Sequence, residues 1–132
     1  MSEHANVLRL REGYEAFGKG DLAALDDLFA ADIRWYEAGH NQLSGTYEGR
    51  EAVYALFGRL FELTEGSFRL DVLTMFADDT DGVVVAEASA RCGPRSFERL
   101  PEVHVWRFSP EGQVVEFRHA MTDAYAVDEV FG

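Results

Sequence analysis

The sequence predicts a single α+β domain spanning residues 1–132, in which three N-terminal helices pack on a curved antiparallel β-sheet and enclose a pocket. Before residue 66, apolar residues recur mainly at intervals of three and four, which is the spacing of one helix face. After residue 67, β-branched and aromatic runs alternate with short turns rich in Gly, Asp and Pro. Helices followed by an antiparallel meander are typical of an α+β cone with an apolar interior.

Three segments have the periodicity of amphipathic helices. The first covers residues 6–17, and Gly20 supplies the break that ends it. Asp21 is placed to cap a short second helix whose apolar residues continue to Phe29. The third helix lies within REAVYALFGRLFELTEG, residues 50–66, and the glycine ends it.

The strands are predicted from runs of β-formers bounded by turn residues. IRWYE, residues 33–37, is expected to form one strand that leads into the loop AGHNQLSG. Further strands are expected at residues 68–77, 83–92, 97–108 and 113–121. The final segment AYAVDEVF suits either a short helix or a pairing tail.

The charge balance excludes several kinds of partner. The chain has 24 acidic residues against 12 Lys and Arg, so its formal charge is -12 and it repels both nucleic acids and anionic membranes. No apolar run approaches the ~18 residues of a membrane span. The first twenty residues carry charges throughout and lack the apolar segment of a signal peptide, which predicts a cytoplasmic protein.

Titratable residues interrupt two strands that should have a buried face. Strand alternation puts side chains at every second position on the same side of a sheet. It places His104, Trp106 and Phe108 on one face, and in the next strand Val115, Phe117, His119, Met121 and Asp123. If these faces line the interior, the two histidines are partly dry, and burial disfavours their charged forms unless a carboxylate is near.

Glu37 and Asp123 are the two candidate carboxylates. Glu37 shares its strand face with Ile33 and Trp35 at the point where the strand meets the loop, so it is either a general base or a solvated strand end. Asp123 is either catalytic or the N-cap of the segment that follows it. For His104, the alternative to catalysis is a core histidine bonded to a backbone carbonyl.

Metal and cofactor sites are not expected. His119 and Asp123 have a helical metal-ligand spacing, but their segment is predicted to be a strand. No G-x-S-x-G or G-x-G-x-x-G motif is present, and Cys92 follows an apolar run as a small core residue would. His40 lies in the loop, either at the surface or in contact with substrate. Of the kinds of catalysis considered, acid–base chemistry without a cofactor is the one that these motifs leave open.

Three stretches carry a family resemblance that covers nearly the whole chain. GDLAALDDLFAADIRWYE, SGTYEGREAV and EVHVWRFSPEGQVVEFRHAMTD are similar to the NTF2-like (cystatin-like) superfamily, in its branch of SnoaL-like polyketide cyclases and ketosteroid isomerases. The resemblance places Glu37 where those isomerases have their general-base aspartate, and His104 where they have a protonated aspartate. Gly13 falls at the position of their oxyanion tyrosine, so Tyr14 lies one residue after that position.

Other branches of the superfamily place the chemistry differently. In SnoaL-like cyclases the acid–base aspartate follows the last long strand, and Asp123 is similar in placement. Limonene epoxide hydrolases use an Asp–Arg–Asp set, and here Glu102 and His104 fall on two of those positions. Epoxide opening by that set is therefore not expected.

These observations together predict an acid–base enzyme that isomerises, cyclises or dehydrates a small apolar carbonyl compound. Glu37 or Asp123 would be the base, His104 would donate to the substrate oxygen, and Tyr14 would be a second donor. Substrate contacts are expected from Trp35, His40, Trp106, Phe108, Phe117 and His119. The alternative is a non-catalytic module of the same fold that binds an apolar ligand or dimerises. Val103, Val105 and Val114 on the outer sheet face predict a homodimer in either case.

Overall fold

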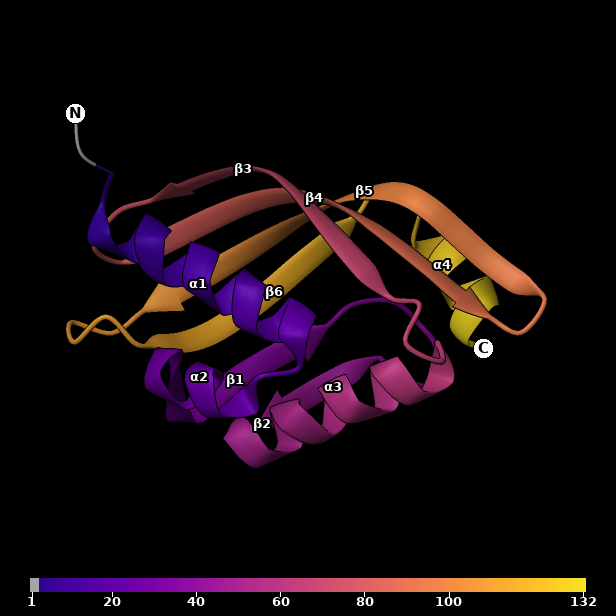
Figure 1. The fold of residues 1–132 in the computed structure, drawn as a ribbon, viewed down its shortest axis with the longest axis horizontal. Helices are drawn as coiled ribbons and strands as arrows, with labels where there is room; N and C mark the ends of the chain where they lie inside the picture. The colour runs from indigo at the N-terminus through magenta and orange to yellow at the C-terminus, as the bar shows by residue number, and fades with distance from the viewer. Residues whose placement is uncertain (1–2) are drawn as a thin grey trace.

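The computed structural model describes residues 3–132, and Figure 1 shows their arrangement as helices packed against a strongly curved sheet. The helices are α1 (Ala5–Lys19), α2 (Leu22–Leu28), α3 (Arg50–Leu63) and α4 (Ala124–Phe131). The strands are β1 (Phe29–Glu37), β2 (Gly45–Glu48), β3 (Arg69–Ala77), β4 (Asp81–Cys92), β5 (Arg95–Phe108) and β6 (Val114–Met121). The predicted α+β architecture is confirmed.

The sheet has six strands in the order β2-β1-β6-β5-β4-β3. Neighbouring strands are antiparallel, as predicted, except for β1 and β6, which run parallel and make the sheet mixed. The parallel pair arises because the chain leaves β1, forms β2, α3 and three more strands, and returns beside β1 only with β6. Helices α1, α2 and α3 gather on one side of the curved sheet, whereas α4 lies apart from them near the turn between β4 and β5 (Figure 1).

The ends of the first two helices follow the predicted capping chemistry. Gly20 adopts a left-handed conformation with φ 68°, and its N–H bonds the carbonyls of Ala16 and Phe17. The Asp21 side chain accepts a hydrogen bond from the backbone N–H of Ala24, as an N-cap should.

The strand β1 begins earlier than the sequence pattern predicts. Phe29 was expected in the second helix, but it pairs with Val114 of β6 and is almost fully buried there. An apolar side chain at this position suits a helix as well as a strand, and the pairing with β6 places it in the strand. Strand β2 was missed because its Gly–Thr–Tyr–Glu sequence is too short to show alternation.

A bulge corrects one prediction about the outer face of the sheet. Arg107 pairs with Glu116, but Phe108 pairs with Val114, so the register shifts by one residue between them. Val114 therefore turns inward and is completely buried, contrary to its expected place beside Val105 on the outer face. Val105 itself is 42% exposed.

The final segment is a helix, which decides the alternative that the sequence left open. Val127, Val130 and Phe131 of α4 join the hydrophobic core. The residues described here include no helix long and apolar enough to cross a membrane.

Candidate active site

An apolar cavity of about 70 Å³ lies between the helices and the concave face of the sheet. Most of its wall is aliphatic or aromatic, and Trp35 stacks on Phe117 with ring centroids 3.7 Å apart. Five lining residues carry groups that can exchange or accept protons: Tyr14, Glu37, Glu102, His104 and His119. An apolar concavity with a few convergent polar groups is the usual form of a small-molecule site.

Helix α1 brings the hydroxyl of Tyr14 onto Nδ1 of His104 in β5. The two rings are nearly parallel, at an interplanar angle of 4°. Trp106, two residues further along β5, donates its indole N–H to the same hydroxyl at 3.1 Å. Burial raises the pKa of Tyr14 well above its ordinary value, so the hydroxyl keeps its proton at rest.

Close packing of α1 against α2 explains why position 13 is a glycine and carries no tyrosine. A Cβ atom at Gly13 would lie 2.6 Å from Cδ2 of Leu28, so α1 and α2 pack too closely for a side chain there. The next residue, Tyr14, lines the cavity and reaches His104 from its own position on the helix.

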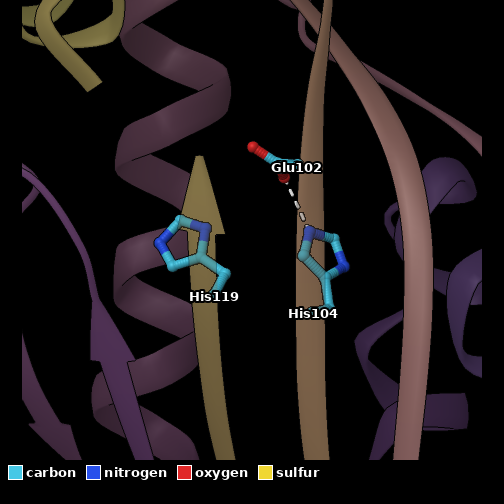
Figure 2. A group of neighbouring side chains, drawn as sticks. All are labelled: Glu102, His104 and His119. Atoms are coloured by element: carbon cyan, nitrogen blue, oxygen red, sulfur yellow. Dashed lines mark hydrogen bonds and ion pairs between the residues drawn. The ribbon is translucent and has the colours of Figure 1, made fainter. Parts of the chain in front are cut away.

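His104 is bonded on its other side to Glu102. Its Nε2 atom lies 2.6 Å from Oε1 of Glu102, and both side chains are less than a tenth exposed (Figure 2). Both ring nitrogens of His104 thus have partners within the protein. Of Tyr14 and His104, it is therefore the Tyr14 hydroxyl that can still contact a substrate. Glu102 was not among the predicted site residues, although its position two residues before His104 puts it on the same strand face.

His119 lies directly opposite His104 in the antiparallel pairing of β5 and β6. The backbone N–H of Ala38 donates to Nε2 of His119 at 2.9 Å. The same nitrogen lies 3.6 Å from Oε2 of Glu37, so β1 and β6 are joined by a histidine whose ring is almost fully buried.

Glu37 sits at the end of β1 with about a fifth of its side chain exposed. Its Oε1 atom accepts a hydrogen bond of 2.8 Å from the indole N–H of Trp35. Burial raises the pKa of Glu37 above its ordinary value, and the nearby Glu102 carboxylate acts in the same direction. His119 and the bond from Trp35 act against this rise without cancelling it. A buried carboxyl group whose pKa is raised is a candidate for acid–base work.

Within residues 3–132, the side chains of Glu102, His104 and His119 form the group that could hold a metal ion. One ligand atom from each residue lies within 4.8 Å of the other two. However, ligands of one tetrahedral zinc ion lie roughly 3.3 Å apart, given bonds of about 2.0–2.1 Å. The 2.6 Å separation of Glu102 and His104 is that of a hydrogen bond, so the side chains as they stand are bonded to one another and are not spaced for an ion.

Three of the predicted site residues lie away from the cavity wall. Asp123 caps α4, accepting a bond of 3.1 Å from the backbone N–H of Ala126, which is the structural alternative considered for it. His40 is an exposed loop residue whose backbone N–H bonds Asp128. Phe108 is buried in the core but does not line the cavity. The cavity does bring together the predicted residues Tyr14, Trp35, Glu37, His104, Trp106, Phe117 and His119.

The charged residue types in the cavity wall favour a neutral ligand. Among the residues that the structure describes, no Lys or Arg lines it, whereas two carboxylates do. An anionic ligand would therefore be repelled and left without a partner in a dry environment.

A cavity enclosed by a curved sheet and its covering helices defines this protein as a cone-shaped NTF2-like, or cystatin-like, α+β protein. The chain belongs to the family of the SnoaL-like domain, whose family model matches residues 10–117. An uncharacterised protein of Mycobacterium tuberculosis strain H37Rv, Rv0034, is 30% identical over 86 residues. This match covers 65% of each chain, so the chain spans just under two thirds of the length of that relative.

Solved structures agree with this assignment. Bal32a, from a soil-derived mobile gene cassette, is 31% identical, with a TM-score of 0.91 and 96% of each chain covered. An NTF2-like protein of unknown function from Burkholderia pseudomallei is 28% identical, with a TM-score of 0.84 over 99% of this chain and 98% of that one. A candidate SnoaL-like polyketide cyclase from Jannaschia sp. CCS1 shares the fold at 18% identity, with a TM-score of 0.80 over 99% and 96% of the two chains.

Proposed function

We propose that this protein is an acid–base enzyme that moves a proton on a small, uncharged and largely apolar carbonyl compound, without a cofactor. The result would be isomerisation, cyclisation or dehydration. The observation that carries the proposal is the meeting of two proton-handling groups in one apolar cavity: Glu37 from β1, and the Tyr14–His104 pair from α1 and β5.

Two such groups are what enolisation requires. Removing a proton next to a carbonyl puts negative charge on the oxygen, so one group must take the proton while another supports the oxygen. Burial raises the pKa of Glu37, so its carboxyl holds a proton to a higher pH than an ordinary glutamate does, which suits a group that gives or takes a proton. The hydroxyl of Tyr14 is held in place by Trp106 and His104, so it needs little reorganisation during the reaction.

The cavity limits the substrate to a compact neutral compound. Drug-sized ligands occupy pockets of about 300–1,000 Å³, whereas this cavity is about 70 Å³. The carboxylates and the lack of a lining cation disfavour carboxylic acids, phosphates and coenzyme A thioesters. The likeness to a candidate polyketide cyclase adds support for carbonyl chemistry.

Hydrogen–deuterium exchange tests this function without knowledge of the natural product. Purified protein in D₂O would be incubated with cyclopentanone, 2-cyclohexenone, cyclohexanone and acetophenone, and the loss of the α-proton signals followed by NMR. We expect at least one ketone to exchange more than ten times faster than in buffer. Glu37→Gln should slow that exchange by about 10²-fold or more, the usual contribution of a general acid–base group.

The matched control is His40→Ala, which removes an exposed histidine outside the cavity. It should leave the exchange rate unchanged. If Glu37→Gln and Tyr14→Phe both exchanged at the wild-type rate, the proposal would be overturned, because any exchange would then come from elsewhere.

A binding protein without catalysis is the second candidate. No buried side-chain polar atom in residues 3–132 lacks a hydrogen-bond partner. A site whose polar groups are already satisfied can hold an apolar ligand by burial alone. This candidate predicts a thermal shift with a small apolar ligand that persists in Glu37→Gln, together with no exchange of any ketone.

A further inference from the structure

We propose that Asp128 of α4 is a positioning residue for Glu37: it anchors the loop between β1 and β2, and the anchored loop holds Glu37 at the cavity. The use of Glu37 in a reaction rests on the proposed function. The anchoring does not, and it can be measured on the protein without a substrate.

The loop of residues 38–44 begins directly after Glu37, at the end of β1, and returns to the sheet at Gly45 in β2. Glu37 and Gly45 are partners in the pairing of the two strands, so they form the last pair before the loop. The first loop residue, Ala38, donates its backbone N–H to Nε2 of His119 at 2.9 Å. The conformation of the loop therefore determines where β1 presents the Glu37 side chain.

Asp128 receives two hydrogen bonds from this loop. Its Oδ1 atom accepts the side-chain N–H of Asn41 at 2.8 Å and the backbone N–H of His40 at 2.9 Å. The bond from Asn41, and then the bond from His40, lower the pKa of Asp128 below its ordinary value. Hydrogen bonds to an ionised carboxylate are stronger than those between neutral groups, so this half-buried side chain is a firm attachment point.

A glycine lets the loop approach the carboxylate this closely. A Cβ atom at Gly39 would lie 2.7 Å from Oδ1 of Asp128, which is closer than such atoms come in proteins. The residue also has a φ of 96°, a conformation that other residues adopt only with strain. The contact between the loop and Asp128 thus depends on the residue type at position 39.

Asn41 connects the attachment point to the rest of the loop. Its side-chain carbonyl accepts the backbone N–H of Leu43, a buried residue of the cavity wall, at 2.9 Å. Its backbone N–H donates to Oγ of Ser44, and the Ser44 hydroxyl donates to the carbonyl of Ala38, both at 3.0 Å. A continuous series of hydrogen bonds therefore joins Asp128 to the first residue of the loop.

A second attachment should keep the loop folded when the first one is removed. Gln42 is bonded to the guanidinium of Arg59 in α3 and to the backbone carbonyl of Phe131 at the end of α4. Loss of the Asp128 side chain should therefore loosen the side of the loop next to β1 while the protein stays folded. An acid–base group has to stay within hydrogen-bond reach of its substrate, and a misplacement of about 1 Å can lower a rate by about 100-fold.

The two tryptophans report the position of Glu37 in the absence of substrate. The indole N–H of Trp35 donates to Oε1 of Glu37, whereas that of Trp106 donates to the Tyr14 hydroxyl. In ¹H–¹⁵N spectra we expect Asp128→Ala to shift or broaden the Trp35 indole signal and to leave the Trp106 signal in place. An unchanged Trp35 signal in the folded variant would overturn the proposal.

Hydrogen exchange of the Ala38 backbone amide measures the loop itself. The bond to His119 protects this amide in the wild type, and Asp128→Ala should make it exchange about tenfold faster or more, as expected for local opening. Asp128→Asn keeps a side-chain oxygen that can accept both loop bonds, so it should restore most of the protection. Equal protection of Ala38 in the wild type and Asp128→Ala would also overturn the proposal.

Two control variants on α4 separate the anchor from the helix. Glu129→Gln removes the neighbouring exposed carboxylate and should leave the Trp35 and Ala38 signals unchanged. Asp123→Ala removes the N-cap of α4 without touching the loop, and it should also leave both signals in place. If Asp123→Ala produced the same changes as Asp128→Ala, the cause would be weakening of the helix, and the proposal would be overturned.

The exchange of ketone protons completes the experiment. With a ketone that the wild type exchanges, Asp128→Ala should lower the rate at saturating ketone by about tenfold or more, because Glu37 is misplaced. KM should change little, because the aromatic walls of the cavity remain, and Asp128→Asn should recover most of the rate. A wild-type rate in Asp128→Ala would overturn the positioning role. A wild type that exchanged no ketone, while the Trp35 and Ala38 signals behaved as expected, would count against the proposed function alone.

Discussion

Tyr14 and His104 lie 90 positions apart in the chain, and the hydroxyl of one contacts Nδ1 of the other. This contact joins α1 to the middle of the sheet, so the packing of the helix and the proton state of the site depend on each other. The same hydroxyl receives the indole N–H of Trp106. One oxygen atom therefore satisfies two buried groups of β5.

We expect Tyr14→Phe to destabilise the fold as well as the site. The change leaves the N–H of Trp106 and Nδ1 of His104 without a partner in a dry environment, which costs about 1–3 kcal/mol. Urea unfolding would measure the loss. Tyr125→Phe is the control, because Tyr125 is 85% exposed and its change should cost less than about 0.5 kcal/mol. Equal stability of the two variants would contradict the hydrogen-bond network.

Regular alternation allowed the inward face of β5 to be predicted from the sequence. His104 and Trp106 are buried at every second position, as expected. The same rule failed at Val114, because a bulge between β5 and β6 adds one residue and reverses the alternation there. No feature of the local sequence marks the bulge, since it depends on how two strands pair.

The candidate site was predictable where its residues share a strand face and not where they meet from different elements. Glu37 and Trp35 could be placed together because they are two residues apart in β1. The contact of Tyr14 with His104 depends on the position of α1 over the sheet, which periodicity does not give. Glu102 lies two residues from His104 and so shares its strand face, but a Glu at such a position is equally common on a solvent-exposed face. Its burial in the structure is what identifies it as a site residue.

Asp123 should prove to be a structural cap. Asp123→Ala removes the side-chain acceptor of the Ala126 N–H and should cost about 1 kcal/mol, the usual cost of losing an N-cap. Asp123→Asn keeps an oxygen for this bond and should be nearly as stable as the wild type. Both variants should exchange ketone protons at the wild-type rate. A loss of exchange in Asp123→Asn, with stability retained, would restore the catalytic alternative.

The raised pKa of Glu37 should appear in the pH dependence of stability. The folded protein holds this proton to a higher pH than the unfolded chain, whose value is near 4.5. Between the two pKa values the folded state binds more protons, so the Glu37 contribution falls as pH rises through that window. Below the window the contribution is fully present, and above it the curve is flat.

Urea midpoints of the wild type and Glu37→Gln would be compared from pH 4 to pH 9. The stability of the wild type relative to Glu37→Gln should fall as the pH rises above about 4.5, the ordinary pKa of a glutamate. Glu48→Gln, at an exposed position on β2, is the control and should show no such trend. A difference that stayed constant above pH 4.5 would mean that the pKa of Glu37 is not raised in the folded protein.

Val105 provides a test of the expected homodimer. Phe76, Val83 and Val105 stand directly opposite one another on β3, β4 and β5, and each is at least a third exposed, so they form an apolar row on the outer face. Such a row favours an interface between two copies. Val105→Lys would place a charge in it and should weaken the dimer more than tenfold, as measured by analytical ultracentrifugation. Leu22→Lys, at an equally exposed residue on α2, should have no effect; a wild-type protein that sediments as a monomer at all concentrations would refute the homodimer.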